Sequence, residues 1–239
     1  MKIRPLSEID LARVAPLPPD QKRRALEQIR YGHPPHSYAP VRACFSDLLN
    51  VRPGGLVGAL PRTPWEKIKD TISKRSKSDS EQDANLRVAE GLFDYAEQHA
   101  LAGRHHEIFP LALGIGTKVV FWHPVVLTID SRPLVPFFDP RRTKALTVQG
   151  RRFVFSVMHE RIRAADPDFA EVALGVVQFS LSEKGPRVPI LHMDAGVTLF
   201  SFDELDLMVR DTYDMWREVV EERAAETRRR AGGKGDGFI

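Results

Sequence analysis

The spacing of hydrophobic residues along this chain changes near Gly103, and this change limits the folds that the chain can adopt. Before that point, apolar and small residues recur every three or four positions over residues 80–101, which predicts a helix closed by Gly103. After it, runs rich in Val, Ile, Leu and Phe lie between Gly and Pro turns. They predict five or six strands, within residues 108–115, 118–129, 134–138, 171–181, 187–193 and 197–200.

Helix signals also lie outside this region. Prolines at the entrance and helical spacing of apolar residues predict a helix within residues 17–32, and Thr63 is expected to cap another. Helical spacing over residues 147–165 predicts a helix that packs on the sheet. The clearest signal is the capping box from Ser201 to Glu204, followed by a long amphipathic pattern.

Helices and strands follow one another without a regular βαβ alternation, which favours an α+β fold over a doubly wound sheet. We therefore expect a helical N-terminal region and a mainly antiparallel sheet packed by helices. A long amphipathic C-terminal helix should complete the fold.

The formal net charge of +3 conceals an uneven distribution. Residues 1–79 hold 15 Lys and Arg against 8 Asp and Glu, a net charge of +7, whereas residues 80–239 hold 20 against 24, a net charge of −4. The polar run 74–83 has no apolar residue to bury and predicts a solvated linker. We expect a basic helical region at 1–79, an α+β domain at 80–230 and a flexible tail at 231–239.

Cysteine content and hydropathy indicate the compartment. Cys44 is the single cysteine and cannot form an internal disulfide. The first residues lack the apolar core of a secretory signal, and no run approaches the ~18 apolar residues that a membrane helix needs. These features predict a cytoplasmic protein without a membrane partner, and the apolar neighbours of Cys44 predict a buried thiol.

Motifs for catalysis or for cofactors are weak. No Gly-x-Ser-x-Gly elbow occurs, and residues 114–118 lack the spacing and order of a phosphate-binding loop, so they predict a turn. Two close histidine pairs occur, His33 with His36 and His105 with His106, and neither pair by itself supplies the three or four convergent ligands of a zinc site, so these histidines are expected in loops. We expect neither metal nor cofactor, and a protein that is not an enzyme.

Two other function classes remain open as alternatives. A metal-dependent nuclease would have to bring carboxylates together in a basic cleft, drawn from Asp130, Asp139, Glu160 and Glu171. None of these four acids begins a Glu-x-Lys or Asp-x-Lys triplet, the usual mark of restriction-type nucleases. A DNA-binding module would use basic side chains of the N-terminal helices to contact phosphates: Lys22, Arg23, Arg24, Lys67, Lys69, Lys74, Arg75 and Lys77.

One short motif is typical of a partner-binding peptide. The segment Gln178-Phe179-Ser180-Leu181-Ser182 resembles the pentapeptide with which many bacterial proteins bind the replicative sliding clamp. In that pattern glutamine forms hydrogen bonds at a pocket rim while leucine fills an apolar cleft. Ser182 departs from the pattern at its last apolar position. A plain core strand is the alternative, because Val177, Phe179 and Leu181 alternate toward one face.

Longer segments between Val125 and Trp216 carry a family resemblance. They are Val125-Val126-Leu127-Thr128-Ile129-Asp130, Phe137-Phe138-Asp139-Pro140-Arg141-Arg142, His159-Glu160-Arg161-Ile162-Arg163, Asp166-Pro167-Asp168 and Val176-Val177-Gln178-Phe179. With these segments the chain resembles SocB-type proteins, the toxins of the SocAB toxin–antitoxin system.

The resemblance implies a function and partners. It implies a toxin that binds the sliding clamp of DNA polymerase III (DnaN) and blocks replication elongation. It also implies an antitoxin, SocA, that acts as an adaptor and delivers the toxin to the ClpXP protease. Carried over to this sequence, the clamp-binding residues would be Gln178, Phe179, Ser180 and Leu181, with Ser182 at the divergent last position. A weak DNA contact of the basic N-terminal region would be an additional interaction.

Overall fold

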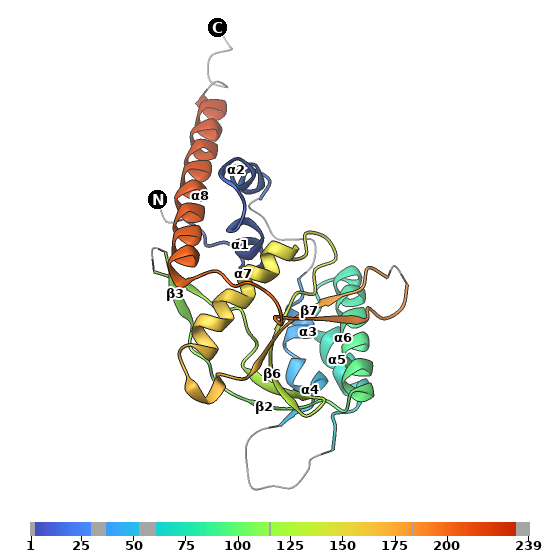
Figure 1. Ribbon diagram of the computed structural model, residues 1–239. Helices are drawn as coiled ribbons and strands as arrows, with labels where there is room; N and C mark the ends of the chain where they lie inside the picture. The colour runs from blue at the N-terminus through green and yellow to red at the C-terminus, as the bar shows by residue number, and fades with distance from the viewer. Residues whose placement is uncertain (1–2, 30–36, 53–60, 115, 183, 233–239) are drawn as a thin grey trace.

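The computed structural model describes residues 3–29, 37–52, 61–114, 116–182 and 184–232, and shows a sheet with helices on both faces (Figure 1). The sheet has the strand order β1-β2-β5-β6-β7-β8, and β3 and β4 form a separate pair. The main strands are β1 Val51–Arg52, β2 Ala102–His105, β5 Val125–Ile129, β6 Arg132–Phe138, β7 Ala173–Phe179 and β8 Pro189–Met193. The small pair is β3 Leu111–Leu113 and β4 Thr117–Val119. The α+β fold class is confirmed.

Within the six-stranded sheet, most neighbouring strands run antiparallel. β2 pairs with β5, β5 with β6, and β7 with β8 in this way, while β1·β2 and β6·β7 are parallel. Asp130 and Ser131 form the tight β5–β6 turn with positive φ angles of 49° and 63°. The connection from β6 to the parallel β7 runs through a helix, α7 Val148–Met158, as such a crossover requires. β7 therefore lies inside the sheet, between β6 and β8.

Two hydrophobic clusters cover the two faces of the sheet. One joins the sheet to α7, α1 Glu8–Val14, α2 Pro19–Glu27 and α8 Phe202–Gly232. The other joins it to α3 Ala39–Arg42, α4 Phe45–Leu48, α5 Trp65–Arg75 and α6 Asp79–Gln98. Successive residues of β7 alternate between them, with Val176 in the first cluster and Val177 in the second. Because both faces are covered, β7 is apolar almost throughout.

The local signals of α7 and α8 are confirmed. The side chain of Thr147 accepts a hydrogen bond from the backbone of Gly150 and caps α7. At the start of α8, the Ser201 amide donates to Glu204 Oε2 at 2.7 Å and the Glu204 amide donates to Ser201 Oγ at 3.3 Å, which is the reciprocal capping box. α7 continues into a π-helix, η1 His159–Arg163, followed by a short 3-10 turn, η2 Pro167–Phe169.

The predicted role of Gly103 is wrong. α6 ends at Gln98, Ala100 takes the positive φ of 45°, and the Leu101 amide closes the helix on Ala96 O at 2.8 Å. Gly103 lies in β2, where an added Cβ would come within 2.7 Å of a Leu127 side-chain methyl. The glycine therefore permits close strand packing and does not end the helix.

Other sequence boundaries also shift. The expected strand at 197–200 is irregular chain, and the run 118–129 divides between β4 and β5, which belong to different sheets. The first residue of α5 is Trp65, but its cap position is Pro64, and Thr63 Oγ1 instead donates to Asp47 Oδ1 at 2.7 Å.

The expected linker at 74–83 is mostly helical. Only residues 76–78 separate α5 from α6, and the side chain of Ser78 caps α6. Glu81 is buried although it is charged, because its carboxylate accepts the amides of Lys77 at 2.6 Å and Ser37 at 2.8 Å. These bonds lower the pKa of Glu81 and explain how a polar segment becomes ordered.

The division at residue 79 stays a prediction, and residues 1–79 contribute to both hydrophobic clusters. α8 continues to Gly232, so the first two residues of the expected tail are helical, and 233–239 lie outside the described residues. His33 and His36 lie outside the described residues too.

None of the described helices is long and apolar enough to cross a membrane.

Candidate docking site at the end of β7

The Gln178–Ser182 segment lies where β7 leaves the sheet. Gln178 and Phe179 are the last two residues of the strand, and the remaining three begin the connection to β8. Ser180 still pairs with Val188, the residue before β8, since its amide donates to Val188 O at 2.9 Å and the Val188 amide donates to Ser180 Oγ at 3.0 Å. The motif therefore spans the boundary between the interior of the sheet and its connection.

Both polar atoms of the Gln178 side-chain amide have hydrogen-bond partners within the protein. Its Oε1 accepts from Arg151 Nη1 at 3.0 Å, and its Nε2 donates to Asp139 Oδ2 and to Leu146 O, both at 3.1 Å. These contacts connect β7 to α7 and to the loop after β6. In the clamp-binding pattern this glutamine forms hydrogen bonds to the rim of a pocket on the clamp. Here it forms its hydrogen bonds within its own protein.

The other residues of the motif differ sharply in exposure. Phe179 is only 4% exposed and belongs to the cluster on the α6 side, whereas Leu181 is 66% exposed. Ser182 is held through its backbone, with its carbonyl oxygen accepting from Arg87 Nη2 at 2.5 Å. Leu181 is thus the one large apolar side chain of the motif that a partner can reach without a change of fold.

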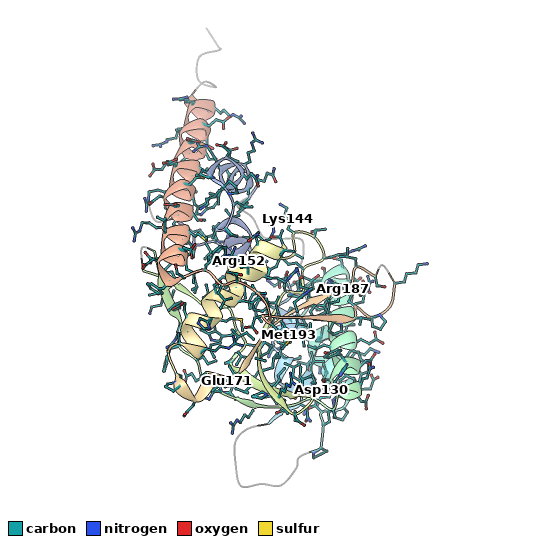
Figure 2. The ribbon with its side chains drawn as sticks, in the orientation of Figure 1. Asp130, Lys144, Arg152, Glu171, Arg187 and Met193 are labelled. Carbon is teal, nitrogen blue, oxygen red and sulfur yellow. The ribbon has the colours of Figure 1, made fainter. Side chains whose placement is uncertain are left out.

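Arg187 is a functional candidate that the sequence analysis missed. This residue, labelled in Figure 2, is only 3% exposed, and its Nε donates to Ser180 O at 2.9 Å while Nη1 donates to Pro140 O at 2.7 Å. Burial is the main cause that lowers the pKa of its guanidinium. In the sequence it is marked only as a cation beside an apolar run, because Pro140 and Tyr38, two of its partners, lie 47 and 149 positions away along the chain.

The acids of the nuclease alternative lie in separate settings. Asp139 is fully buried and accepts the Leu146 amide at 2.7 Å as well as the amide of Gln178. Asp130 lies in the β5–β6 turn, Glu160 in the π-helix and Glu171 just before β7. Within the described residues, no three His, Cys, Asp or Glu side chains are grouped to hold a metal ion. The predicted convergence of carboxylates is not found in this part of the chain.

Part of the basic N-terminal face is already neutralised or buried. Lys22 is only 4% exposed, and burial lowers the pKa of its amine. Arg23 Nη2 lies 2.6 Å from Glu222 and its Nη1 lies 3.1 Å from Glu218, so α2 is ion-paired to α8. These two cations support the packing of α2 on α8, and the DNA-binding alternative loses their contribution.

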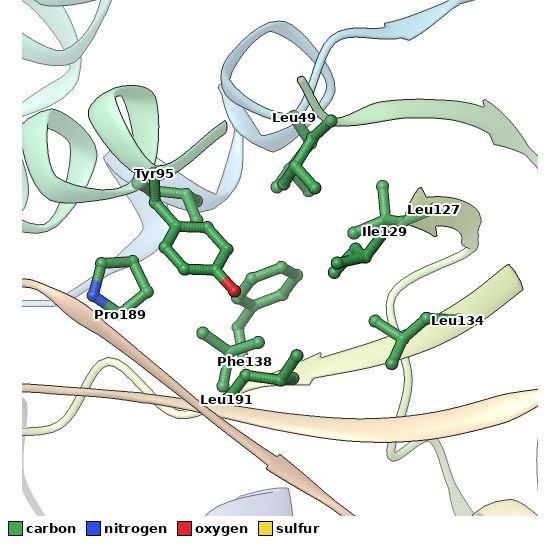
Figure 3. Close-up of a pocket in the computed structure, with 11 residues that line it drawn as sticks. Leu49, Tyr95, Leu127, Ile129, Leu134, Phe138, Pro189 and Leu191 are labelled. Carbon is green, nitrogen blue, oxygen red and sulfur yellow. The ribbon is translucent and has the colours of Figure 1, made fainter. Parts of the chain in front are cut away.

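Two hollows lie elsewhere in the molecule. The first is a cavity of about 10 Å³, room for about one water molecule, between α6 and the sheet. Its lining is apolar, and Figure 3 shows the Tyr95 ring pointing into it with the hydroxyl toward Phe138. The second is a cleft of about 290 Å³ beside the π-helix, where the rings of His106 and Phe169 lie 4.7 Å apart. Neither presents an activated nucleophile.

Comparisons with known proteins identify the family. The family described as sliding clamp-binding bacterial toxin SocB matches residues 9–226. The chain belongs to the SocB family. One relative in this family is the DNA replication inhibitor toxin SocB of Caulobacter vibrioides (strain NA1000 / CB15N), which is 35% identical over 233 residues, 98% of this chain and 97% of the relative. No solved structure matches the chain.

Proposed function

We propose that this SocB-family protein is a toxin that binds the sliding clamp of the bacterial replicase and blocks elongation of DNA replication. The observation that carries the proposal is the family match over residues 9–226, supported by the near full-length relative that is named as a replication inhibitor. In this proposal the toxin acts by binding, without catalysis of its own, and it acts where the clamp is, in the cytoplasm.

The docking element in this proposal is the Gln178–Ser182 segment, with its two ends serving different purposes. Leu181 enters the apolar groove of the clamp, because it is exposed and of the residue type that the pattern requires. Gln178 and Phe179 act from inside the sheet by fixing the position of the connection. Ser180 and Ser182 flank the leucine, and their backbone carbonyls are held by Arg187 and Arg87.

Replication stops, in this proposal, because a peptide groove on the clamp can hold only one ligand at a time. A toxin in that groove excludes the polymerase and other clamp-binding proteins by competition. Control of the toxin is proposed to follow the SocAB pattern, in which SocA binds the toxin and delivers it to ClpXP. The support for this control is the family membership.

Clamp binding by the Leu181→Ala variant tests the proposal. Full burial of a leucine contributes about 1.5–3 kcal/mol, so its loss should weaken affinity for purified clamp by roughly ten- to a hundredfold. The matched control is Leu207→Ala, because Leu207 is 54% exposed on α8 and is of the same residue type. Surface plasmon resonance against immobilised clamp gives both affinities.

The control variant should bind as the parent chain does, and processive primer extension should be inhibited by the parent and by Leu207→Ala but not by Leu181→Ala. Equal affinity of both variants would remove Leu181 from the docking element. A parent chain that does not bind the clamp would overturn the proposed function itself. Thermal unfolding of each variant checks that the fold is retained.

A further inference from the structure

The connection between β7 and β8, residues 180–188, is bonded to α6 by one arginine of that helix. Arg87 Nε donates to Gly185 O at 2.9 Å, and Arg87 Nη2 donates to Ser182 O at 2.5 Å. The carbonyl of Arg87 accepts the amide of Arg187 at 2.8 Å. Figure 1 shows this connection beside α6. A single residue of α6 therefore bonds the connection at three places.

A glycine of α6 allows the connection to approach the helix closely. Gly91 lies four residues after Arg87, on the same face of the helix. A Cβ added to Gly91 would come within 2.0 Å of the carbonyl oxygen of Arg187. Glycine weakens the interior of a helix, so the contact with the connection explains why the residue here has no side chain.

The side chain of Arg187 holds the start of the connection from inside the protein. It is only 3% exposed. Its acceptors in the described part of the chain are all neutral, namely the Tyr38 hydroxyl and the carbonyls of Phe179, Ser180, Pro140 and Arg141. A guanidinium directs its donors from one rigid plane, so these bonds fix the direction in which the chain leaves β7.

The two arginines hold the backbone on both sides of Leu181. The carbonyl before it, Ser180 O, accepts from Arg187, and the carbonyl after it, Ser182 O, accepts from Arg87. The side chain of Leu181 is nevertheless 66% exposed. A flexible loop loses conformational freedom when it binds a partner, whereas a loop that is ordered beforehand avoids most of this cost.

We infer that Arg87, Gly91 and Arg187 are positioning residues for clamp docking, which order the connection before the clamp binds and hold Leu181 in the orientation that enters the groove. This inference rests on the proposed function. The three residues act through Leu181 and need no contact with the clamp themselves.

The main test is Arg87→Ala, which removes both side-chain bonds to the connection. The side chain of Arg87 is 17% exposed, so its loss should leave the fold intact. The matched control is Arg152→Ala, because Arg152 is also partly exposed and donates to a loop carbonyl elsewhere, Thr198 O, at 2.6 Å. By surface plasmon resonance, Arg87→Ala should weaken affinity for purified clamp by about five- to tenfold, and the control by less than about twofold.

Two further variants vary the same contacts. Gly91→Ala pushes the connection away from α6 and should cause a loss of affinity similar to that of Arg87→Ala. Arg87→Lys can reach only one of the two carbonyls, because lysine lacks the forked donors of arginine, and should restore part of the affinity.

Two readouts separate a positioning role from a general loss of stability. In the Leu181→Ala background, Arg87→Ala should change clamp affinity by less than about twofold, because its effect passes through the leucine. In the free protein, Arg87→Ala should speed hydrogen exchange of the Arg187 amide by about tenfold or more, while the amides of β6 exchange as in the parent chain.

The outcomes separate the inference from the proposed function. If Leu181→Ala loses clamp binding while Arg87→Ala and Gly91→Ala bind as the parent does or more tightly, the inference fails and the proposed function stands. Equal losses from Arg87→Ala in the parent and Leu181→Ala backgrounds would assign Arg87 a general structural role and also overturn the inference. If the parent chain itself does not bind the clamp, both fail.

Discussion

The two ends of the Gln178–Ser182 segment differ more than their closeness in sequence suggests. Phe179 is 4% exposed and belongs to a core cluster, whereas Leu181, two residues later, is 66% exposed. Gln178 makes three internal hydrogen bonds. Within one pentapeptide, the first residues therefore belong to a strand that is held in the core, and Leu181 is exposed on the surface. A short binding pattern can therefore be fixed in the fold by some of its own residues.

The largest expected effect comes from truncation of the buried end. Phe179→Ala should lower the free energy of unfolding by about 3–5 kcal/mol, because it removes a ring from a packed cluster and leaves a cavity. Urea unfolding followed by circular dichroism measures this. A loss below about 1 kcal/mol would show that the end of β7 is not part of the core and would weaken the comparison.

Acid should destabilise the cluster that contains Phe179. His123 lies against the rings of Phe45 and Phe138, at 5.2 Å and 6.0 Å, and burial first, then nearby His105 and Arg42, lowers its pKa to about 4. The unfolded state then binds more protons, so stability should be complete above about pH 6.5 and should fall as the pH drops toward 4.

The total loss across this window should be about 2–3 kcal/mol. Unfolding free energies measured along the pH series report it, with His123→Phe as the reference, since this variant cannot titrate. If both proteins lose the same stability over the window, His123 does not cause the pH dependence.

An intermediate effect is expected from Gln178→Ala. The change leaves the carboxylate of Asp139 and the guanidinium of Arg151 each without one hydrogen-bond partner, and should cost about 1–3 kcal/mol in stability. Chemical denaturation gives the value. Any loss of clamp affinity in this variant should be accompanied by lower stability, and a loss of affinity at unchanged stability would show instead that Gln178 contacts the clamp directly.

The smallest effect on stability belongs to the exposed end. Leu181→Ala should change the free energy of unfolding by less than about 0.5 kcal/mol, since its side chain is mostly in solvent. Denaturation of this variant beside the Phe179 variant gives the contrast directly. A loss comparable to that of Phe179→Ala would mean that both ends belong to the core.

Elements set by local signals were predictable from the sequence. The capping box at Ser201 and the Thr147 cap lie within one turn of the helices that they start, so the sequence contains their whole cause. β2 was missed because its residues are mostly exposed and carry no apolar pattern, and pairing with β5 defines it. Gly103 was misread for the same reason, since its close neighbours are Val51 and Leu127.

The candidate site was predictable only in part. The spacing of apolar residues predicted the strand, and a resemblance to the clamp-binding pentapeptide suggested the motif. Neither reveals where a strand leaves its sheet, and that point separates Phe179 from Leu181. The contacts of Arg187 with Pro140 and Tyr38 join residues 47 and 149 positions apart, which depends on the assembled fold. The same holds for the Asp139 network, because this acid, considered above for a nuclease site, is a buried acceptor for the amide of Gln178.

α8 offers a practical consequence of the architecture. Its 31 residues correspond to a rod about 46 Å long, and residues after Val220 are mostly exposed. Figure 1 shows the rod extending upward from the left of the body, whereas the β7–β8 connection lies at the right, beside α6. A fluorophore or tether attached near Arg229 would stand clear of the proposed docking segment, Gln178–Ser182. The far end of α8 is therefore a labelling site, and a fluorophore there would allow binding of the toxin to the clamp to be followed by energy transfer.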